Sequence, residues 1–214
     1  MDIIKKHISN GVVFVDEKTA YIDEKAIIGK GTVIEPCVYI KGECVIGENC
    51  LIGFSTEISD SKIGDNVTIK HSYITESEID EGTTIGPFAY LRPSSKVGKN
   101  VKIGDFVEIK NSSIGDKTKI SHLTYVGDCD VGENVNFGCG TVIVNYDGKK
   151  KHRTTIKDNA FIGCNTNLVS PVIVGENAYT AAGSTITDDV PDNALAIARE
   201  RQVNKDDWVL KKQK

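Results

Sequence analysis

An aliphatic residue recurs at nearly every sixth position along most of this chain of 214 residues. The series starts at Ile22 and continues, with a few single-residue contractions and one interruption, through Ile28, Ile34, Ile40, Ile46, Ile52, Ile58, Ile63, Ile69, Ile74, Ile79, Ile85, Leu91, Val97, Ile103, Ile109, Ile114, Ile120, Val126, Val131, Phe137, Ile143, Ile156, Ile162, Leu168, Val174, Thr180 and Ile186. Glycine is often the next residue. Neither a helical period nor simple strand alternation explains this spacing. The repeat therefore predicts a solenoid.

Each six-residue unit predicts a short strand followed by a turn, with the aliphatic side chain directed at the axis of the solenoid. Three units close one coil, so equivalent positions lie about 18 residues apart and the chain holds about nine coils. The aliphatic composition supports strands, because the chain has 26 Ile and 21 Val but only 6 Leu. The expected fold is an all-β parallel β-helix of hexapeptide repeats.

Two terminal regions and one polar, basic internal segment fall outside the repeat. A loop ejected from a solenoid is a common place for function. The expected organisation is a linker helix (Asp2–Ile8) and a first strand (Val12–Val15) in residues 1–16, a β-helix in 17–190 with an ejected loop at 144–155, and a C-terminal tail in 191–214 with a helical turn around Trp208.

Charge and hydropathy exclude several classes of protein. The chain has 26 Lys and Arg and 30 Asp and Glu, a net charge of −4, which argues against nucleic-acid or membrane-surface binding. No apolar run approaches the roughly 20 residues that span a bilayer, and the N-terminus has no signal-peptide core. We therefore expect a cytoplasmic protein whose six cysteines are free thiols. The four histidines are far apart, so no metal site is predicted.

His122 is the first candidate for catalysis, because it follows the repeat residue Ile120 by two positions. An imidazole titrates near neutrality and can accept a proton from an attacking amine. A plain corner histidine is the other interpretation. Glu108 flanks Ile109 and falls within one coil of His122, so its carboxylate could orient the imidazole. An ordinary surface ion pair is the simpler interpretation of Glu108.

A second cluster of candidates is cationic. Arg92 and Lys110 are 18 residues apart, so in an 18-residue coil their side chains stack. Stacked cations repel unless an anion lies between them, which predicts a phosphate or carboxylate ligand. The ejected loop adds further cations to this predicted anion site: Lys149, Lys150, Lys151 and Arg153.

Longer strings point to a family. They are Lys6-His7, Asn10-Gly11-Val12, Tyr90-Leu91-Arg92-Pro93, residues 103–111, Ser121-His122-Leu123-Thr124-Tyr125 up to Asp128, Asn134-Val135-Asn136, Asn145-Tyr146-Asp147-Gly148, Phe161-Ile162-Gly163, Ala181-Ala182-Gly183-Ser184 and Ala194-Leu195-Ala196 with Arg199. Over essentially its whole length the chain resembles the C-terminal acetyltransferase domain of the bifunctional GlmU enzymes, which combine glucosamine-1-phosphate N-acetyltransferase and N-acetylglucosamine-1-phosphate uridyltransferase. Their Gly-rich nucleotide-binding signature has no match here, so we expect no uridyltransferase activity from this chain.

The resemblance implies a left-handed β-helix that transfers acetyl from acetyl-CoA, as co-substrate, to the 2-amino group of glucosamine 1-phosphate. The product would be N-acetylglucosamine 1-phosphate, for UDP-GlcNAc and cell-wall precursor synthesis. His122 matches the general base and Glu108 its polarising partner. The sugar-phosphate contacts match Arg92, Lys110, Tyr125, Asn136 and Lys151. The acetyl-CoA contacts match Cys139, Asn145, Tyr146, Cys164, Ala182 and Arg199.

Two of these positions depart from the family pattern, which has Ala in place of Cys139 and Ser in place of Cys164. A thiol is a poorer hydrogen-bond donor than a hydroxyl, so Cys164 puts positioning of the acetyl group by its side chain in doubt. Backbone N–H groups near Cys139 fit the role of oxyanion donors. A cysteine nucleophile with an acetyl-enzyme intermediate is a less favoured alternative.

The resemblance also implies a homotrimer, with active sites at subunit boundaries and the tail reaching a neighbour. Two other functions stay open: an acyltransferase for a different amino sugar or sugar nucleotide, and a non-catalytic trimeric β-helix module. A γ-type carbonic anhydrase shares the fold but needs three zinc histidines, which the spacing here does not supply.

Overall fold

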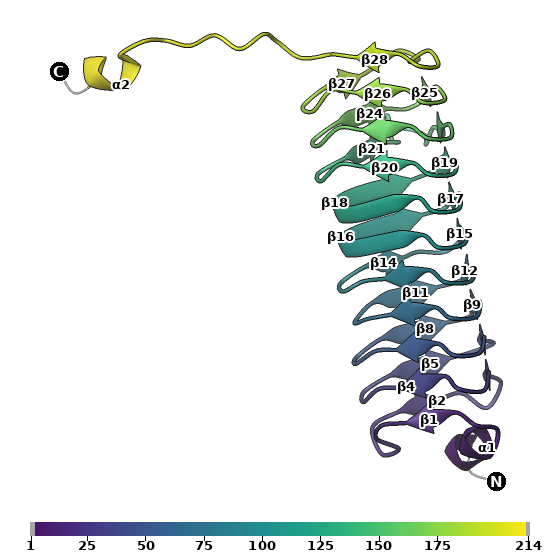
Figure 1. Ribbon diagram of the computed structural model, residues 1–214. Coiled ribbons are helices and arrows are strands. Elements are labelled where there is room, and N and C mark those ends of the chain that lie inside the picture. Colours follow the sequence, from purple (N-terminus) through teal and green to yellow (C-terminus); the bar gives the residue numbers. More distant parts are fainter. Residues whose placement is uncertain (1–2, 213–214) are drawn as a thin grey trace.

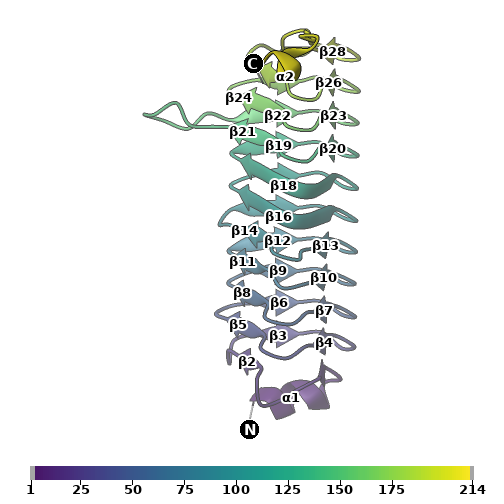
Figure 2. The same cartoon turned by 90° about the vertical axis from the view of Figure 1, so that its left-hand side faces the viewer.

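The computed structural model describes residues 3–212, and in it the chain forms a long prism of stacked coils (Figure 1). The fold is an all-β parallel β-solenoid of about ten turns, close to the predicted nine. Helix α1 (Ile3–Ser9) lies against the N-terminal end of the prism, and the C-terminal tail leaves the opposite end (Figure 1). Viewed from the side, every coil presents the same narrow outline except where one loop projects (Figure 2).

The strands form three faces, and each strand pairs in parallel with strands of the coils above and below. The first face contains β1 (Val13–Phe14), β4 (Val33–Ile34), β7 (Leu51–Ile52), β10 (Thr68–Ile69), β13 (Thr84–Ile85), the start of β16 (Lys102–Lys110) and of β18 (Lys119–Gly127), β20 (Asn136–Phe137), β23 (Phe161–Ile162), β26 (Tyr179–Thr180) and β28 (Leu195–Ala196). The second contains β2 (Tyr21–Ile22), β5 (Tyr39–Lys41), β8 (Glu57–Ser59), β11 (Tyr73–Thr75), β14 (Tyr90–Leu91), the ends of β16 and β18, β21 (Val142–Val144), β24 (Asn167–Val169) and β27 (Thr185–Ile186). The third contains β3 (Ile27–Ile28), β6 (Val45–Ile46), β9 (Lys62–Ile63), β12 (Ser77–Ile79), β15 (Ser95–Val97), β17 (Ser113–Ile114), β19 (Cys129–Val131), β22 (Thr154–Ile156) and β25 (Ile173–Val174).

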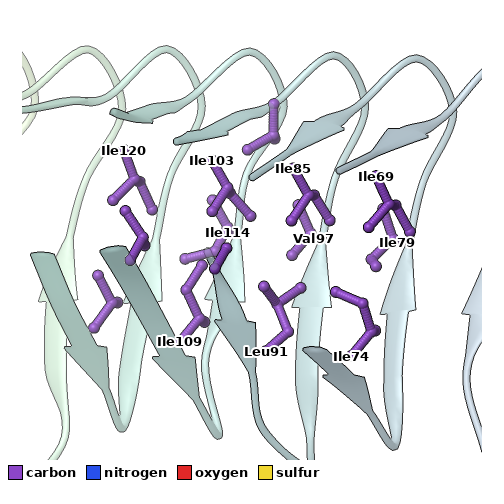
Figure 3. Packing of buried hydrophobic residues seen from close by; sticks show 14 of the residues in the cluster. Ile69, Ile74, Ile79, Ile85, Leu91, Val97, Ile103, Ile109, Ile114 and Ile120 are labelled. Carbon is purple, nitrogen blue, oxygen red and sulfur yellow. The ribbon is translucent and has the colours of Figure 1, made fainter. Parts of the chain in front are cut away.

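The repeat residues fill the axis of the prism, as predicted. Figure 3 shows Ile69, Ile85, Ile103 and Ile120 in one ladder, and the register pairs each of them with the next. Each of these side chains is at most 1% exposed. Burying one such side chain stabilises the fold by about 1.5–3 kcal/mol, so the repeated ladder is the main source of stability.

Strands β16 and β18 differ from all the others in length. Each has nine residues and runs without a break from the first face to the second, whereas the other described strands have two or three. They pair with each other from Lys102↔Lys119 to Lys110↔Gly127. The two coils that they build are therefore fixed to each other around a whole corner of the prism.

The regions outside the repeat differ from the predictions in detail. Helix α1 ends one residue later than predicted, and Asp2 lies outside the described residues. The predicted strand Val12–Val15 shortens to β1, because only its middle pairs with β4. The coil continues past residue 190, since β28 pairs with β26. Helix α2 (Trp208–Lys211) is the predicted helical turn of the tail.

The projecting loop occupies residues 145–153, between β21 and β22. It folds back on itself through an antiparallel bridge between Tyr146 and Lys151. None of the described helices is both long and apolar enough to cross a membrane.

Candidate functional site

His122 lies in the middle of β18, at the corner between the first and second faces. The β16–β18 register places Asp105 directly beside it. Nδ1 of His122 is 2.6 Å from Oδ1 of Asp105. This hydrogen bond holds the pKa of Asp105 below its usual value. The His122 side chain is 58% exposed, so the imidazole is open to a ligand.

The predicted partner of His122, Glu108, has a different contact. Glu108 is in register with Tyr125, three residues further along the strand pair than His122. Its Oε1 atom lies 2.8 Å from Nη1 of Arg92. The simpler interpretation of Glu108, an ordinary ion pair, therefore agrees with its contact to Arg92, and within one chain Asp105 is the carboxylate that contacts the imidazole. The spacing held a signal for Asp105, because 17 residues separate it from His122 and the coils here are contracted to that length.

The predicted stack of cations is present on the second face. Leu91 is in register with Ile109, so Arg92 and Lys110 occupy neighbouring coils at the same height. The Lys151 amine lies against that of Lys110 and within the field of Arg92. Lys110, with Arg92 adding to the effect, lowers the pKa of Lys151 below that of an ordinary lysine. Positive charge is thus crowded where an anion would relieve it.

A buried carboxylate that the sequence did not reveal connects this stack to the loop. Asp128, 6% exposed, accepts hydrogen bonds from Lys110 Nζ at 3.1 Å, Asn111 Nδ2 at 2.6 Å and Asn145 Nδ2 at 2.5 Å. Burial alone would raise the pKa of Asp128, but the three hydrogen bonds outweigh it and keep the pKa low. The spacing held a signal, since Asp128 directly follows Gly127, the residue that lies in register with Lys110 in the next coil.

Asp147 organises the tip of the loop. It accepts the backbone N–H groups of Lys149 and Lys150 and bonds Nε2 of His152 at 2.7 Å. These contacts, that of His152 foremost, lower the pKa of Asp147 to about 2. Lys151 belongs to the segment between Asp147 and His152 that this contact closes.

The other loop cations do not join the stack. Arg153 makes a two-pronged contact with Asp130 and donates to the Asn111 carbonyl at 3.0 Å. The predicted place of Arg153 in the anion site is not found in the chain, because its side chain lies on the third face with Asp130 of β19. Lys149 and Lys150 are exposed at the loop tip. Of the predicted loop cations, Lys151 alone contacts the stack within the described part of the chain.

Four of the predicted acetyl-CoA residues follow His122 along the same edge. The Gly140 amide donates to Leu123, which places Cys139 beside His122 in the next coil. The Asn165 amide donates to Cys139 and the Gly183 amide to Cys164, so Cys164 and Ala182 continue the series. Arg199 lies at the far end, with its Cδ near Gly183. The edge therefore offers a continuous track of small side chains that leads to a cation.

The remaining predicted residues divide between the faces. Tyr125 lies on the second face with the cations, with its hydroxyl 3.4 Å from Nδ2 of Asn145. Asn145 is buried, and its amide is engaged by Asp128, whereas Tyr146 is 56% exposed on the loop. Asn136 lies in β20 on the first face, so one copy of the chain does not bring it to the cation stack.

All six cysteines are free, and Cys139 and Cys164 are accessible at the edge. The amide N–H of Cys139 has no hydrogen-bond partner within residues 3–212. Over the same residues, no group of three or more His, Cys, Asp or Glu side chains is arranged to hold a metal ion.

Comparison with known proteins agrees with this architecture. "Bifunctional protein GlmU" from Clostridium kluyveri is 60% identical over 210 residues, which is 98% of this chain and 46% of that protein. The protein of the same name from Acetivibrio thermocellus is 61% identical over the same shares. The chain thus spans about half the length of the curated relatives that it matches, in their C-terminal part, and the resemblance seen in the sequence is confirmed.

Solved structures show the same fold at lower identity. The UDP-N-acetylglucosamine acyltransferase LpxA from Bacteroides fragilis superposes with a TM-score of 0.59 at 23% identity, over 85% of this chain and 70% of that one. The six-repeat pattern of the bacterial transferase hexapeptide family matches residues 25–60, 76–111 and 153–188, which together make up half of the chain. The protein therefore belongs to the bacterial transferase hexapeptide family.

Proposed function

We propose that this protein transfers an acetyl group from acetyl-CoA to the 2-amino group of glucosamine 1-phosphate, giving N-acetylglucosamine 1-phosphate and CoA. The observation that carries the proposal is the open imidazole of His122 in β18 together with the cation stack, in which Lys110 at the end of β16 lies between Arg92, which follows β14, and Lys151 of the loop. An amino sugar phosphate supplies an amine for the base and an anion for Lys151, the member of the stack that has no ion pair among the described residues, whereas Arg92 and Lys110 are paired with Glu108 and Asp128. The similarity to GlmU proteins supports this substrate.

The chemistry needs one proton acceptor and one oxyanion site. The amine nitrogen attacks the thioester carbonyl, and Nε2 of His122 takes a proton from that nitrogen. The unpartnered N–H of Cys139, beside His122, donates to the oxyanion that develops. The carbon–sulfur bond then breaks, and the CoA sulfur takes the proton back from the His122 imidazolium, so that CoA leaves as a thiol and the base is restored. Acetyl-CoA extends along the track of Cys139, Cys164 and Ala182, with a CoA phosphate at Arg199.

The direct test is CoA release from acetyl-CoA in the presence of glucosamine 1-phosphate. Glucosamine, glucosamine 6-phosphate and UDP-glucosamine serve as competing acceptors in parallel reactions. Turnover selective for glucosamine 1-phosphate supports the proposal. Turnover with another acceptor alone contradicts the substrate, and acetyl-CoA binding without any turnover contradicts the enzyme function.

Anion binding at the cation stack is expected to weaken as the pH rises. The weakening should begin at a pH below the pKa of an ordinary lysine. Lys110 lowers the pKa of Lys151, so Lys151 loses its charge first as the pH rises, while the ligand's phosphate stays doubly charged. Binding of glucose 1-phosphate, which has no amine to titrate, can be followed by calorimetry from pH 7 to pH 10. Lys151→Gln should bind about tenfold more weakly at pH 7 and lose the alkaline dependence. Lys150→Gln is the control, and an equal effect of that variant would contradict the assignment.

We also propose that the active unit is a homotrimer, in line with the family resemblance. An exposed apolar ladder runs along the corner that carries His122. Phe54, Phe88, Phe106 and Leu123 are each about half exposed, and the rings of Phe88 and Phe106 stack with centroids 5.5 Å apart. Exposed aromatic rows of this kind suit a protein interface. A second copy on this edge would cover the ladder and bring new side chains to His122.

Phe88→Asp is expected to convert the trimer to a monomer. Phe88 has φ 59°, a left-handed conformation that Asp adopts more readily than Phe, so the substitution should not disturb the coil. It removes apolar contact area and places three like charges near one another in the assembly. Mass photometry measures the outcome, and Phe161→Asp, on the first face, is the control. A Phe88→Asp variant that stays trimeric would show that the ladder is not the interface.

A further inference from the structure

Asp105 is the one side chain that hydrogen-bonds the His122 ring among the residues that the structure describes. The contact occupies Nδ1, and Nε2 has no partner in this same part of the chain. Asp105 in turn makes no other side-chain hydrogen bond or ion pair there. The two groups therefore form an exclusive pair at the surface.

Continuous strand pairing runs through the corner that carries this pair. Asp105 and His122 face each other within the only two strands of nine residues in the described chain. The residues that follow them, Phe106 and Leu123, have φ 55° and φ 44°. Bulky residues rarely adopt this left-handed conformation, and here it lets both strands turn the corner without a loop. Pairing on both sides of the corner fixes the separation of the two side chains.

The other carboxylate of β16 near this corner, that of Glu108, is already paired. Glu108 and Arg92 neutralise each other three positions along the strand pair. On the far side, the next coil presents Cys139. Asp105 is thus the acidic group of β16 that faces the His122 ring. On the other side of β18, the residues of β20, Asn136 and Phe137, carry no charge.

We propose that Asp105 is the positioning residue of the acetyl transfer. Its carboxylate accepts the Nδ1–H of His122 and so leaves the Nε2 lone pair free for the proton of the attacking amine. This inference rests on the proposed function and names Asp105, where the resemblance implied Glu108, as the carboxylate of the same chain that orients the base.

The physical reason is the choice of tautomer. A neutral imidazole carries one proton, and the acceptor at one nitrogen determines which nitrogen keeps it. With Asp105 at Nδ1, Nε2 is the base. When Nε2 takes the proton of the amine, the ring becomes an imidazolium whose charge faces the Asp105 carboxylate, which stabilises the developing charge as base-orienting carboxylates do in other enzymes.

Asp105→Asn tests the proposal, since the amide keeps the size of the side chain and can donate to Nδ1 as well as accept from it. The ring tautomer of His122 is read from ¹⁵N chemical shifts of the full-length protein, and kcat and KM are measured for both substrates. We expect the variant to lose the preference for a proton on Nδ1. Its kcat should fall about 30-fold, a part of the 10²–10⁴ that a positioned general base contributes. KM for acetyl-CoA should stay within twofold.

Asp80→Asn, another exposed carboxylate on a different corner, is the matched control and should leave tautomer and kinetics unchanged. An active wild type whose Asp105→Asn variant keeps both kcat and tautomer would overturn the proposal and leave the proposed function standing. A wild type without acetyl transfer would overturn the proposed function and the catalytic part of this inference together. A variant that loses kcat but keeps the Nδ1–H tautomer would assign Asp105 a purely structural role and overturn the proposal.

Discussion

His122→Ala is expected to reduce kcat for acetyl transfer by about 10²–10⁴, because the attacking amine loses its proton acceptor. Binding of acetyl-CoA should be nearly unchanged, since the imidazole occupies one end of the proposed CoA track. The measurement is CoA release at saturating acetyl-CoA, with the affinity for acetyl-CoA determined separately by calorimetry. The His122 side chain is exposed, so the substitution should leave the coil intact.

His122→Gln provides the matched control for shape. It keeps a polar side chain of similar length that cannot take up a proton at neutral pH. Both variants should be inactive to a similar degree. A His122→Gln protein that keeps more than a tenth of the wild-type kcat would show that the ring positions the substrate and does not act as the base.

Asp128→Ala is expected to lower the free energy of unfolding by about 3 kcal/mol, because it leaves the largely buried Lys110 ammonium without its counter-charge. The Lys110 and Asp128 side chains are only 17% and 9% exposed. The amide groups of Asn111 and Asn145 lose their acceptor as well, so the base of the loop should loosen and binding of glucose 1-phosphate should weaken. Urea unfolding at one fixed protein concentration measures the change in stability.

A surface ion pair supplies the control. Glu43→Ala breaks a contact with Lys25 between two side chains that are 76% and 66% exposed, and it should change stability very little. Equal losses for the two variants would contradict the role of Asp128 as a buried connection.

The pH dependence of stability adds a second check. The folded pKa of Asp128 is lowered, so its contribution is present above its ordinary pKa and is lost as the pH falls through the folded value. Asp128→Asn should lack this acid-side loss.

Much of the fold follows from the hexad alone. A period of six with β-branched residues favours stacked coils. The strands of one coil pair with those of the next, and the aliphatic residues fill the axis. The same arithmetic placed Arg92 beside Lys110, because their spacing equals one coil. Asp128 comes within one residue of the register partner of Lys110, although the acidic residue was not recognised as part of the site. Helix α1 and the turn at Trp208 follow from local signals.

The partner of His122 was decided by the tertiary structure. Asp105 and Glu108 both precede His122 within one coil, and only the local coil length determines which of them comes into register. That length is shortened by one residue here, which brings Asp105 to the ring and Glu108 to Tyr125. The pairing of Glu108 with Arg92 then follows from the geometry of the second face.

In the projecting loop, too, the tertiary structure decided the contacts. Its composition predicted a group of cations, but a hairpin clamped by Asp147 turns Lys151 toward Lys110, while Arg153 reaches Asp130 on another face. By itself the sequence determined the solenoid, the family and the residue types of the site, because these depend on period and spacing within the chain. Only the tertiary structure decided which charges meet, because contacts between coils depend on the register and on where a loop folds back.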